Sequence, residues 1–265
     1  MCDQNFPVEL FALRPARTAL PPLVLLGGMG PLAGANGFAR ACSIFGENRE
    51  ILLLQACSIP DRTRAVLADA RSQAGISPEH MAVVRALEAA LREAIRHVTS
   101  TRRPIDVIAL CNAAHAFLPG VFARTGSGDV RLISLVECVV EELGRRRSRP
   151  ALILSSAGTR VSRIFTRRLD EVGIAWVEPS DRIQATLMRA IYEGLKALDW
   201  ETASVAGEAV FAEVLATHPD IECIVAACTE IPPILDLVKR TGSEDLRKRL
   251  SRIDVVDSVE LALTR

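Results

Sequence analysis

The chain has 265 residues, enough to bury a full core as one or two domains. Apolar residues make up 49% of it and aromatic residues only 4%, which indicates an aliphatic α/β interior and excludes a disordered or fibrous chain. The 32 basic side chains balance the 32 acidic ones, so no net field favours a nucleic acid or a membrane as partner.

Seven cysteines form an odd set without the spacing of a disulfide framework, which favours reduced thiols. No apolar run approaches the roughly 18 residues of a membrane span. The N-terminus lacks a basic stretch followed by a long apolar one, so no signal peptide is expected. These features predict a soluble, cytoplasmic protein.

Residues 1–21 contain prolines and no sustained periodicity, and we expect an N-terminal extension that precedes the fold. A first strand over 23–26 then enters a glycine-rich turn at 27–34. The turn lacks the spacing of a dinucleotide or phosphate loop. The turn suits the binding of a small carboxylate by the backbone. The alternative is that the glycines only allow the chain to turn.

A second strand over 51–55 leads to a loop that carries Asp61 and Arg62. Arg62 is a candidate for a bidentate carboxylate clamp, and a surface ion pair is the alternative. Helical spacing over 78–98 predicts a helix that covers the sheet.

Two apolar runs, 105–109 and 221–226, each lead into a cysteine, Cys111 and Cys228. Each run predicts a buried parallel strand, and a helix-like pattern follows each cysteine. The carboxyl end of such strands is where ligands bind in open α/β folds. A further strand is expected over 130–136, with the next helix starting at 137.

The strand pattern repeats along the chain. Strands expected at 151–154, 176–180, 221–227 and 252–257 repeat the first four at offsets of 117 to 128 residues. We therefore predict two similar doubly wound α/β domains that arose by internal duplication, with the active site in the cleft between them. The expected bounds are 22–136, joined by a C-terminal helix at 257–265, and 137–256.

Paired thiols on opposite faces of one carbon suit racemisation, because one thiolate removes a proton and the other thiol returns one. The ordinary pKa of cysteine, about 8.5, lies near working pH, and a helix N-terminus is expected to lower it. The expected donors for the substrate carboxylate are four backbone N–H groups, those of Asn112, Ala113, Thr229 and Glu230. The other cysteines are expected to be buried structural residues: Cys2, Cys42, Cys57, Cys138 and Cys223.

His115 and Glu230 leave alternatives open. His115 follows Cys111 by four residues and suits a Cys–His pair or half of a zinc site, although no second cluster supplies further ligands. We therefore predict no metal. Glu230 orients or tunes Cys228, or is a solvated helix residue.

Five motifs carry a family resemblance: Gly27-Gly28-Met29-Gly30-Pro31-Leu32-Ala33, Ile59-Pro60-Asp61-Arg62-Thr63, Cys111-Asn112 with Ala114-His115-Ala116-Phe117, Ile191-Tyr192-Glu193-Gly194-Leu195-Lys196, and Cys228-Thr229-Glu230. In this order they resemble the aspartate racemase branch of the cofactor-independent aspartate/glutamate racemase superfamily, over roughly 23–264.

The resemblance implies an enzyme without pyridoxal phosphate or metal that interconverts L- and D-aspartate, or glutamate, and is commonly a homodimer. By it, Cys228 is the base for the L-enantiomer and Cys111 for the D-enantiomer, with His115 and Glu230 in support. The substrate-binding candidates are Met29, Gly30, Arg62, Asn112, Ala113, Ser156, Lys196 and Thr229.

Two positions depart from the family, which usually has threonine where Ala113 and Gly34 stand. Losing the hydroxyl at 113 removes a hydrogen bond worth about 1 kcal/mol. Two alternatives to the racemase therefore stay open. One is an isomerase of the maleate isomerase kind that uses one cysteine covalently, and the other is an amino-acid-binding regulator with weakened catalysis.

Overall fold

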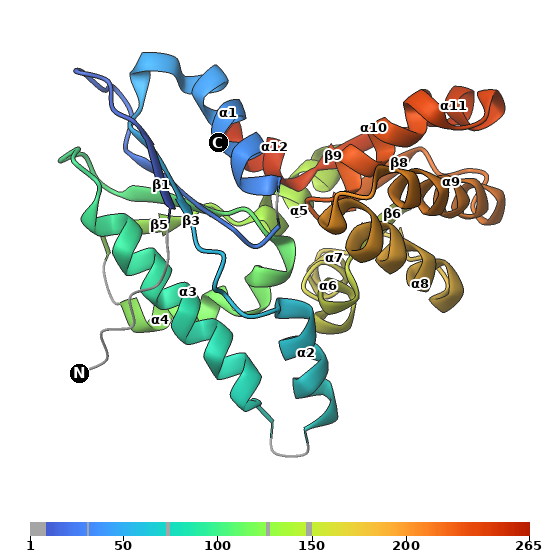
Figure 1. The fold of residues 1–265 in the computed structure, drawn as a ribbon, viewed down its shortest axis with the longest axis horizontal. Helices are drawn as coiled ribbons and strands as arrows, with labels where there is room; N and C mark the ends of the chain where they lie inside the picture. The colour runs from blue at the N-terminus through green and yellow to red at the C-terminus, as the bar shows by residue number, and fades with distance from the viewer. Residues whose placement is uncertain (1–8, 31, 73–74, 126–127, 147–149) are drawn as a thin grey trace. The chain divides into compact units, whose positions relative to one another are not determined.

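The computed structural model describes residues 9–30, 32–72, 75–125, 128–146 and 150–265, so Cys2 and Pro31 lie outside the described residues. The chain divides into two compact units, residues 1–135 with 262–265, and residues 136–261 (Figure 1). The division expected from the sequence has its boundaries at 136/137 and 256/257. The C-terminal helix α12 (Ser258–Leu263) begins in the second unit, and its last residues belong to the first.

The first unit contains a five-stranded sheet in the order β1-β3-β2-β4-β5. Strands β2 to β5 are parallel, and β2 and β4 are buried along their whole length because helices cover them. The strands are β1 (Glu9–Leu13), β2 (Leu23–Gly27), β3 (Ile51–Gln55), β4 (Ile105–Ala109) and β5 (Val130–Leu132).

The prediction that residues 1–21 precede the fold as an extension is wrong for Glu9–Leu13. These residues form β1, which pairs antiparallel with β3 from Glu9↔Gln55 to Leu13↔Ile51. The five residues of β1 contain no proline and place Leu10 against the apolar core, so they complete the sheet as an edge strand. Phe11 lies on the exposed side, 48% accessible, in contact with the Phe38 ring. Part of the N-terminal segment therefore belongs to the fold.

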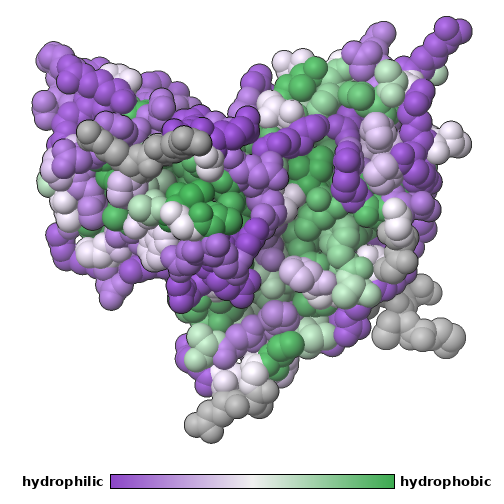
Figure 2. Space-filling model, turned by 180° about the vertical axis from the view of Figure 1, so that it is seen from behind, coloured by the Kyte–Doolittle hydropathy of each residue, from purple (hydrophilic) through white to green (hydrophobic). Residues whose placement is uncertain are grey.

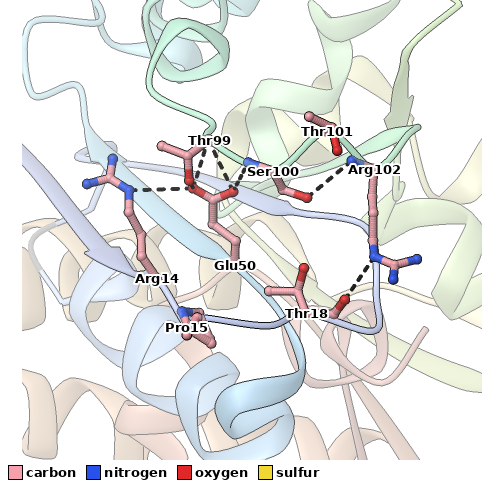
Figure 3. A pocket seen from close by; sticks show the side chains of 9 residues that line it. Arg14, Pro15, Thr18, Glu50, Thr99, Ser100, Thr101 and Arg102 are labelled. Carbon is pink, nitrogen blue, oxygen red and sulfur yellow. Dashed lines mark hydrogen bonds and ion pairs between the residues drawn. The ribbon is translucent and has the colours of Figure 1, made fainter.

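The chain after β1 crosses the amino ends of the strands, where it lines a pocket of about 280 Å³ with the 99–102 loop (Figure 3). The buried carboxylate of Glu50 fixes this corner by accepting from the Thr99 N–H, the Thr99 hydroxyl and the Ser100 N–H. Arg14 lies 3.5 Å from the same carboxylate, and Arg102 donates to the Thr18 carbonyl. The pocket is thus at the opposite end of the sheet from the cysteine-bearing turn.

Among the described residues, α1 to α4 are the α-helices that lie wholly within the first unit. The longest, α3, begins with Ser77 as N-cap and a proline in its first turn, and it buries one apolar face, including Leu87 and Leu91, in the core beside β2 and β4. The helices are α1 (Ala33–Phe45), α2 (Arg62–Arg71), α3 (Pro78–Arg96) and α4 (Leu118–Thr125), with 3₁₀ helices at Gly46–Asn48 and Asn112–Ala116.

The second unit has a four-stranded parallel sheet in the order β7-β6-β8-β9. Its strands are β6 (Ala151–Ser155), β7 (Trp176–Val177), β8 (Cys223–Ala227) and β9 (Asp254–Asp257). Its helices are α5 (Leu135–Arg146), α6 (Ala157–Ser162), α7 (Thr166–Glu171), α8 (Asp181–Arg189), α9 (Trp200–Thr217), α10 (Ile231–Thr241) and α11 (Glu244–Leu250), with a π-helical turn at Ala190–Gly194 and a 3₁₀ turn at Leu195–Ala197.

The two sheets share one parallel topology, because the order β3-β2-β4-β5 matches β7-β6-β8-β9 strand for strand. This confirms the predicted duplicated α/β fold. The strand expected over 130–136 is shorter than predicted: β5 ends at Leu132, and α5 already begins at Leu135. Ser134 directly precedes that helix. Serine is favoured at this position because its hydroxyl can hydrogen-bond the backbone of the first helical turn, which competes with pairing in a strand.

Figure 2 shows mostly hydrophilic side chains on the visible face, with hydrophobic ones gathered in patches. Several large apolar side chains are exposed among the described residues: Phe11, Leu20, Ile76, Val161, Val172, Leu198, Trp200 and Val205. Within the described ranges, none of the helices combines the length and the hydropathy that crossing a membrane requires.

We expect the Asp106→Ala variant to lose about 3–5 kcal/mol of unfolding free energy. Asp106, 1% exposed at the start of β4, accepts from buried Arg49 and from Arg131 at 2.7 and 3.0 Å, so its removal leaves the Arg49 charge buried. Urea unfolding measures the loss. Glu244→Ala, which breaks an exposed pair with Lys248, is the control and should cost about 0.5 kcal/mol or less. Equal losses in the two variants would contradict the assignment.

Candidate active site

Each sheet reverses its strand order between its first and third parallel strands, β2 and β4 in one unit and β6 and β8 in the other. In open α/β sheets ligands bind at the carboxyl end beside this switch point. The register pairs Leu26 with Ala109, and Ser155 with Ala227. Each cysteine-bearing turn therefore lies next to the turn that leaves the first strand of its own unit.

Cys111 is half-buried and extended, and the expected helix after it is the 3₁₀ helix Asn112–Ala116. Asn112 is 2% exposed, and neither its amide nitrogen nor its amide oxygen has a hydrogen-bond partner among the described residues. A buried amide left without partners costs free energy that a bound ligand recovers. Asn112 is thus the side chain that points most directly to a ligand in this unit. Ala113 beside it is buried, 7% exposed.

His115 does not form the Cys–His pair that was one of the expected alternatives. Its Nδ1 lies 3.1 Å from the Cys111 carbonyl oxygen, and its Nε2 accepts from the Leu135 N–H at 3.0 Å. Burial lowers the pKa of His115 to about 4, against the opposing effect of hydrogen bonds to the backbone of Cys111 and Asn112. The ring is therefore neutral at pH 7, with both nitrogens engaged by backbone.

Arg62 is not on a loop as expected but is the first residue of α2, with Asp61 as the N-cap. Its guanidinium is buried and donates to the carbonyl oxygens of Ile59, Pro60 and Met29. These bonds tie the glycine turn of β2 to the start of α2. Met29 and Gly30, both predicted substrate contacts, are buried in that turn.

Gln55 is a residue that the sequence analysis missed. It ends β3, and its buried Oε1 has no hydrogen-bond partner among the described residues. A Cβ added at Gly34 would lie 2.1 Å from this oxygen, and one at Gly27 would lie 2.2 Å from it. The carboxamide thus fills the space between two glycines at the carboxyl end of the sheet. A polar residue closing the apolar run 51–54 was the available signal.

Cys228 directly follows β8, a strand that is buried throughout, and its thiol donates to Glu230 Oε2 at 3.0 Å. The Thr229 hydroxyl donates to the same oxygen at 3.0 Å. Glu230 is 5% exposed, so it is a partner of the thiol and not a solvated helix residue. Its helix, α10, starts only at Ile231, three residues after the cysteine.

The pKa of Cys228 is raised well above its usual range, first by burial and then by the charge and hydrogen bond of Glu230. This contradicts the expectation that a helix N-terminus lowers it. The Lys196 charge acts in the opposite direction and lowers the pKa. Lys196 also lies 4.2 Å from the centre of the Tyr192 ring, just after the π-helical turn. Such turns are frequent at functional sites.

Ser156, a predicted substrate contact, is the N-cap of α6 and is 6% exposed. Its hydroxyl accepts from the Thr159 N–H at 3.3 Å and lies 3.1 Å from the Thr159 hydroxyl. Since Ser155 pairs with Ala227, Ser156 lies directly beside the Cys228 turn.

Within the described ranges, no disulfide joins the other cysteines. Cys138 and Cys223 are buried as expected and Cys42 is half-buried, but Cys57 is exposed, because it lies in the loop after β3 and not in the core. Within the described ranges, no three His, Cys, Asp or Glu side chains are grouped as a metal site requires.

Comparison with known proteins shows to which family this duplicated α/β fold, with a cysteine at each switch point, belongs. Residues 26–265 match the Asp/Glu/Hydantoin racemase family, so the chain belongs to that family.

Similar solved structures extend over nearly the whole chain. Aspartate racemase from Picrophilus torridus superposes with a TM-score of 0.64 at 21% identity, covering 92% of this chain and 91% of its own. An aspartate racemase homologue from Pyrococcus horikoshii OT3 has a TM-score of 0.59 at 18% identity, covering 92% of this chain and 96% of its own. Glutamate racemase from Thermus thermophilus, in complex with β-chloro-D-alanine, has a TM-score of 0.57 at 17% identity, covering 94% of this chain and 79% of its own. These likenesses establish the fold.

We expect Glu230→Gln to lower the pKa of the Cys228 thiol, because it removes a negative charge that disfavours the thiolate. The pH dependence of alkylation by iodoacetamide, followed on the Cys228 peptide by mass spectrometry, measures the shift. Glu230→Asp is the control and should leave the pKa raised. A midpoint in the glutamine variant at or above that of the natural protein would contradict the role assigned to the carboxylate.

Proposed function

We propose that this chain interconverts the L- and D-forms of aspartate, or of glutamate, without pyridoxal phosphate or metal, by a two-base mechanism that uses Cys111 and Cys228. The observation that carries the proposal is the repeated placement of a cysteine within two residues of the end of the third parallel strand of each sheet. Membership of the racemase family supports the reaction class. The acid/base roles of the two thiols belong to the proposal.

In the proposed reaction the Cys228 thiolate takes the α-proton of the L-enantiomer, and the electron pair left on carbon spreads into the α-carboxylate. The Cys111 thiol then gives its proton to the opposite face. The reaction leaves Cys228 as thiol, Cys111 as thiolate and the D-enantiomer as product. The reverse direction starts from that state, so protons balance over a cycle.

The charge that develops on the carboxylate needs donors, since the α-proton is otherwise too weakly acidic for a thiolate. Asn112 offers a buried amide without partners for this role. Backbone N–H groups at the cysteine-bearing turns are the other proposed donors. The Cys228 thiol already donates to Glu230, and we propose that this carboxylate receives the thiol proton when the thiolate forms.

Lys196 is the proposed partner of the substrate's side-chain carboxylate. Its charge acts on the Cys228 thiol, and its position after the π-helical turn holds it over Tyr192. Arg62, the other predicted clamp, donates to three backbone carbonyls, and we propose that its main task is to hold the Met29 turn.

We expect Cys111→Ser and Cys228→Ser each to reduce racemisation of aspartate by roughly 10³-fold or more, because a serine hydroxyl at these positions is too weak an acid and base. Incubation of L-aspartate in deuterated water, followed by chiral chromatography and mass spectrometry, measures deuterium at the α-carbon together with inversion. Cys42→Ser, a half-buried cysteine on α1, is the control and should keep full activity.

Two results would rule the proposal out. Tight binding of aspartate or glutamate by the natural protein without α-proton exchange would mean that the chain is an amino-acid-binding regulator. A covalent substrate adduct on a single cysteine, seen in the intact mass, would mean isomerase chemistry through a nucleophilic thiol.

We expect Lys196→Gln to raise the KM for aspartate about 10- to 100-fold, the loss that follows from removing a hydrogen bond to a charged group. Lys196→Arg keeps the charge and should recover part of the affinity. Lys248→Gln, on an exposed helix, is the control for loss of one surface charge. An unchanged KM in Lys196→Gln would exclude this residue from side-chain recognition.

A further inference from the structure

His115 joins two backbone positions that are 24 residues apart in sequence, Cys111 and Leu135. Because Nε2 accepts the Leu135 N–H, the ring proton of the neutral histidine must be on Nδ1. Nδ1–H therefore donates to the Cys111 carbonyl oxygen, 3.1 Å away. With one nitrogen donating and the other accepting, the ring has neither a free lone pair for a metal nor a free site for proton transfer.

The two backbone groups that His115 contacts are both hard to satisfy in other ways. The Leu135 N–H is the first of α5 and has no partner within its own helix, and Leu135 is fully buried. The Cys111 carbonyl also accepts the Ala114 N–H at 3.2 Å, which closes the turn that aims the thiol. His115 thus links the turn of Cys111 to the residue at which the chain leaves the first unit.

We propose that His115 is a positioning residue that holds the Cys111 turn against the start of α5 and thereby sets the thiol for proton transfer. Its catalytic consequence rests on the proposed function, whereas its effect on the Cys111 thiol does not. Both hydrogen bonds are required, because a ring attached at one end only leaves the turn free to shift relative to α5.

Two amide side chains separate the two contacts. Asparagine in place of the histidine would put a donor near the position of Nδ1 but could not reach the Leu135 N–H, and glutamine would supply an acceptor near Nε2 without the donor to Cys111. The variants are therefore His115→Asn and His115→Gln, and His115→Leu removes both bonds. His97→Gln is the matched control, since His97 is an exposed histidine that interacts with Glu93.

A second route leaves the histidine in place. Leu135→Pro removes the backbone N–H that His115 accepts, together with part of the leucine side chain, at a first-turn position where proline fits a helix. Leu135→Ala removes a similar amount of side chain but keeps the N–H. The comparison of these two variants tests the same link if the histidine variants do not fold.

The readouts are the iodoacetamide alkylation rates of Cys111, Cys228 and Cys57 from peptide mass spectrometry, and α-proton exchange started from L- and from D-aspartate. We expect His115→Asn and His115→Gln each to change the Cys111 rate at least fivefold, with the rates of Cys228 and Cys57 within twofold of the natural protein. Exchange from D-aspartate should fall about tenfold, while exchange without inversion from L-aspartate persists.

Folded variants in which the Cys111 rate stays within twofold of the natural value would overturn the proposal. So would equal changes at Cys111 and Cys228, which indicate general loosening of the fold. If the natural protein exchanges no α-proton, the proposed function fails, and the alkylation rates still decide whether His115 positions Cys111.

Discussion

The arrangement of each candidate half-site depends on how a fully buried parallel strand ends. The backbone of such a strand must stay hydrogen-bonded until it turns, since water cannot replace the missing partners. After β4 the Cys111 carbonyl accepts the N–H of Ala114, and after β8 the Cys228 carbonyl accepts the N–H of Ile231, each three residues on. The same tight turn therefore follows both strands, and the cysteine occupies its first position in each.

The cysteine in this turn has a different electrostatic environment in each unit. Cys228 lies in a charged environment, where burial and Glu230 raise the thiol pKa and Lys196 lowers it. Cys111 lies beside a histidine that is neutral and saturated by backbone. Under the proposed mechanism, Cys228 is held as a thiol until its proton passes to Glu230. A thiolate formed in this environment is a strong base, because the burial that disfavours it is not relieved.

The sequence predicted the features that follow from periodicity and from the strand ends: the duplicated parallel sheets and both cysteines at their carboxyl ends. The expected strand over 105–109 coincides with β4, and that over 151–154 lies within β6. The sequence did not predict β1, because a five-residue edge strand shows too little apolar periodicity to be distinguished from an irregular N-terminal extension. The contacts of Arg62 and His115 were also missed. Both depend on carbonyl and N–H groups that only the folded chain brings near them.

The departure at Gly34 has a physical explanation that the sequence alone did not supply. Any side chain at this position would overlap the Gln55 carboxamide, whose Oε1 is 2.1 Å from the place of a Cβ. A threonine at this position would therefore require the Gln55 side chain to move from its present place between the two glycines. A polar group is kept at the carboxyl end of the sheet, but it reaches there from β3 instead of α1. Ala113 has no such replacement on the same turn, where Asn112 retains the only side-chain amide of the 112–116 helix. The first unit therefore presents two buried carboxamide oxygens that have no hydrogen-bond partner among the described residues, those of Asn112 and Gln55.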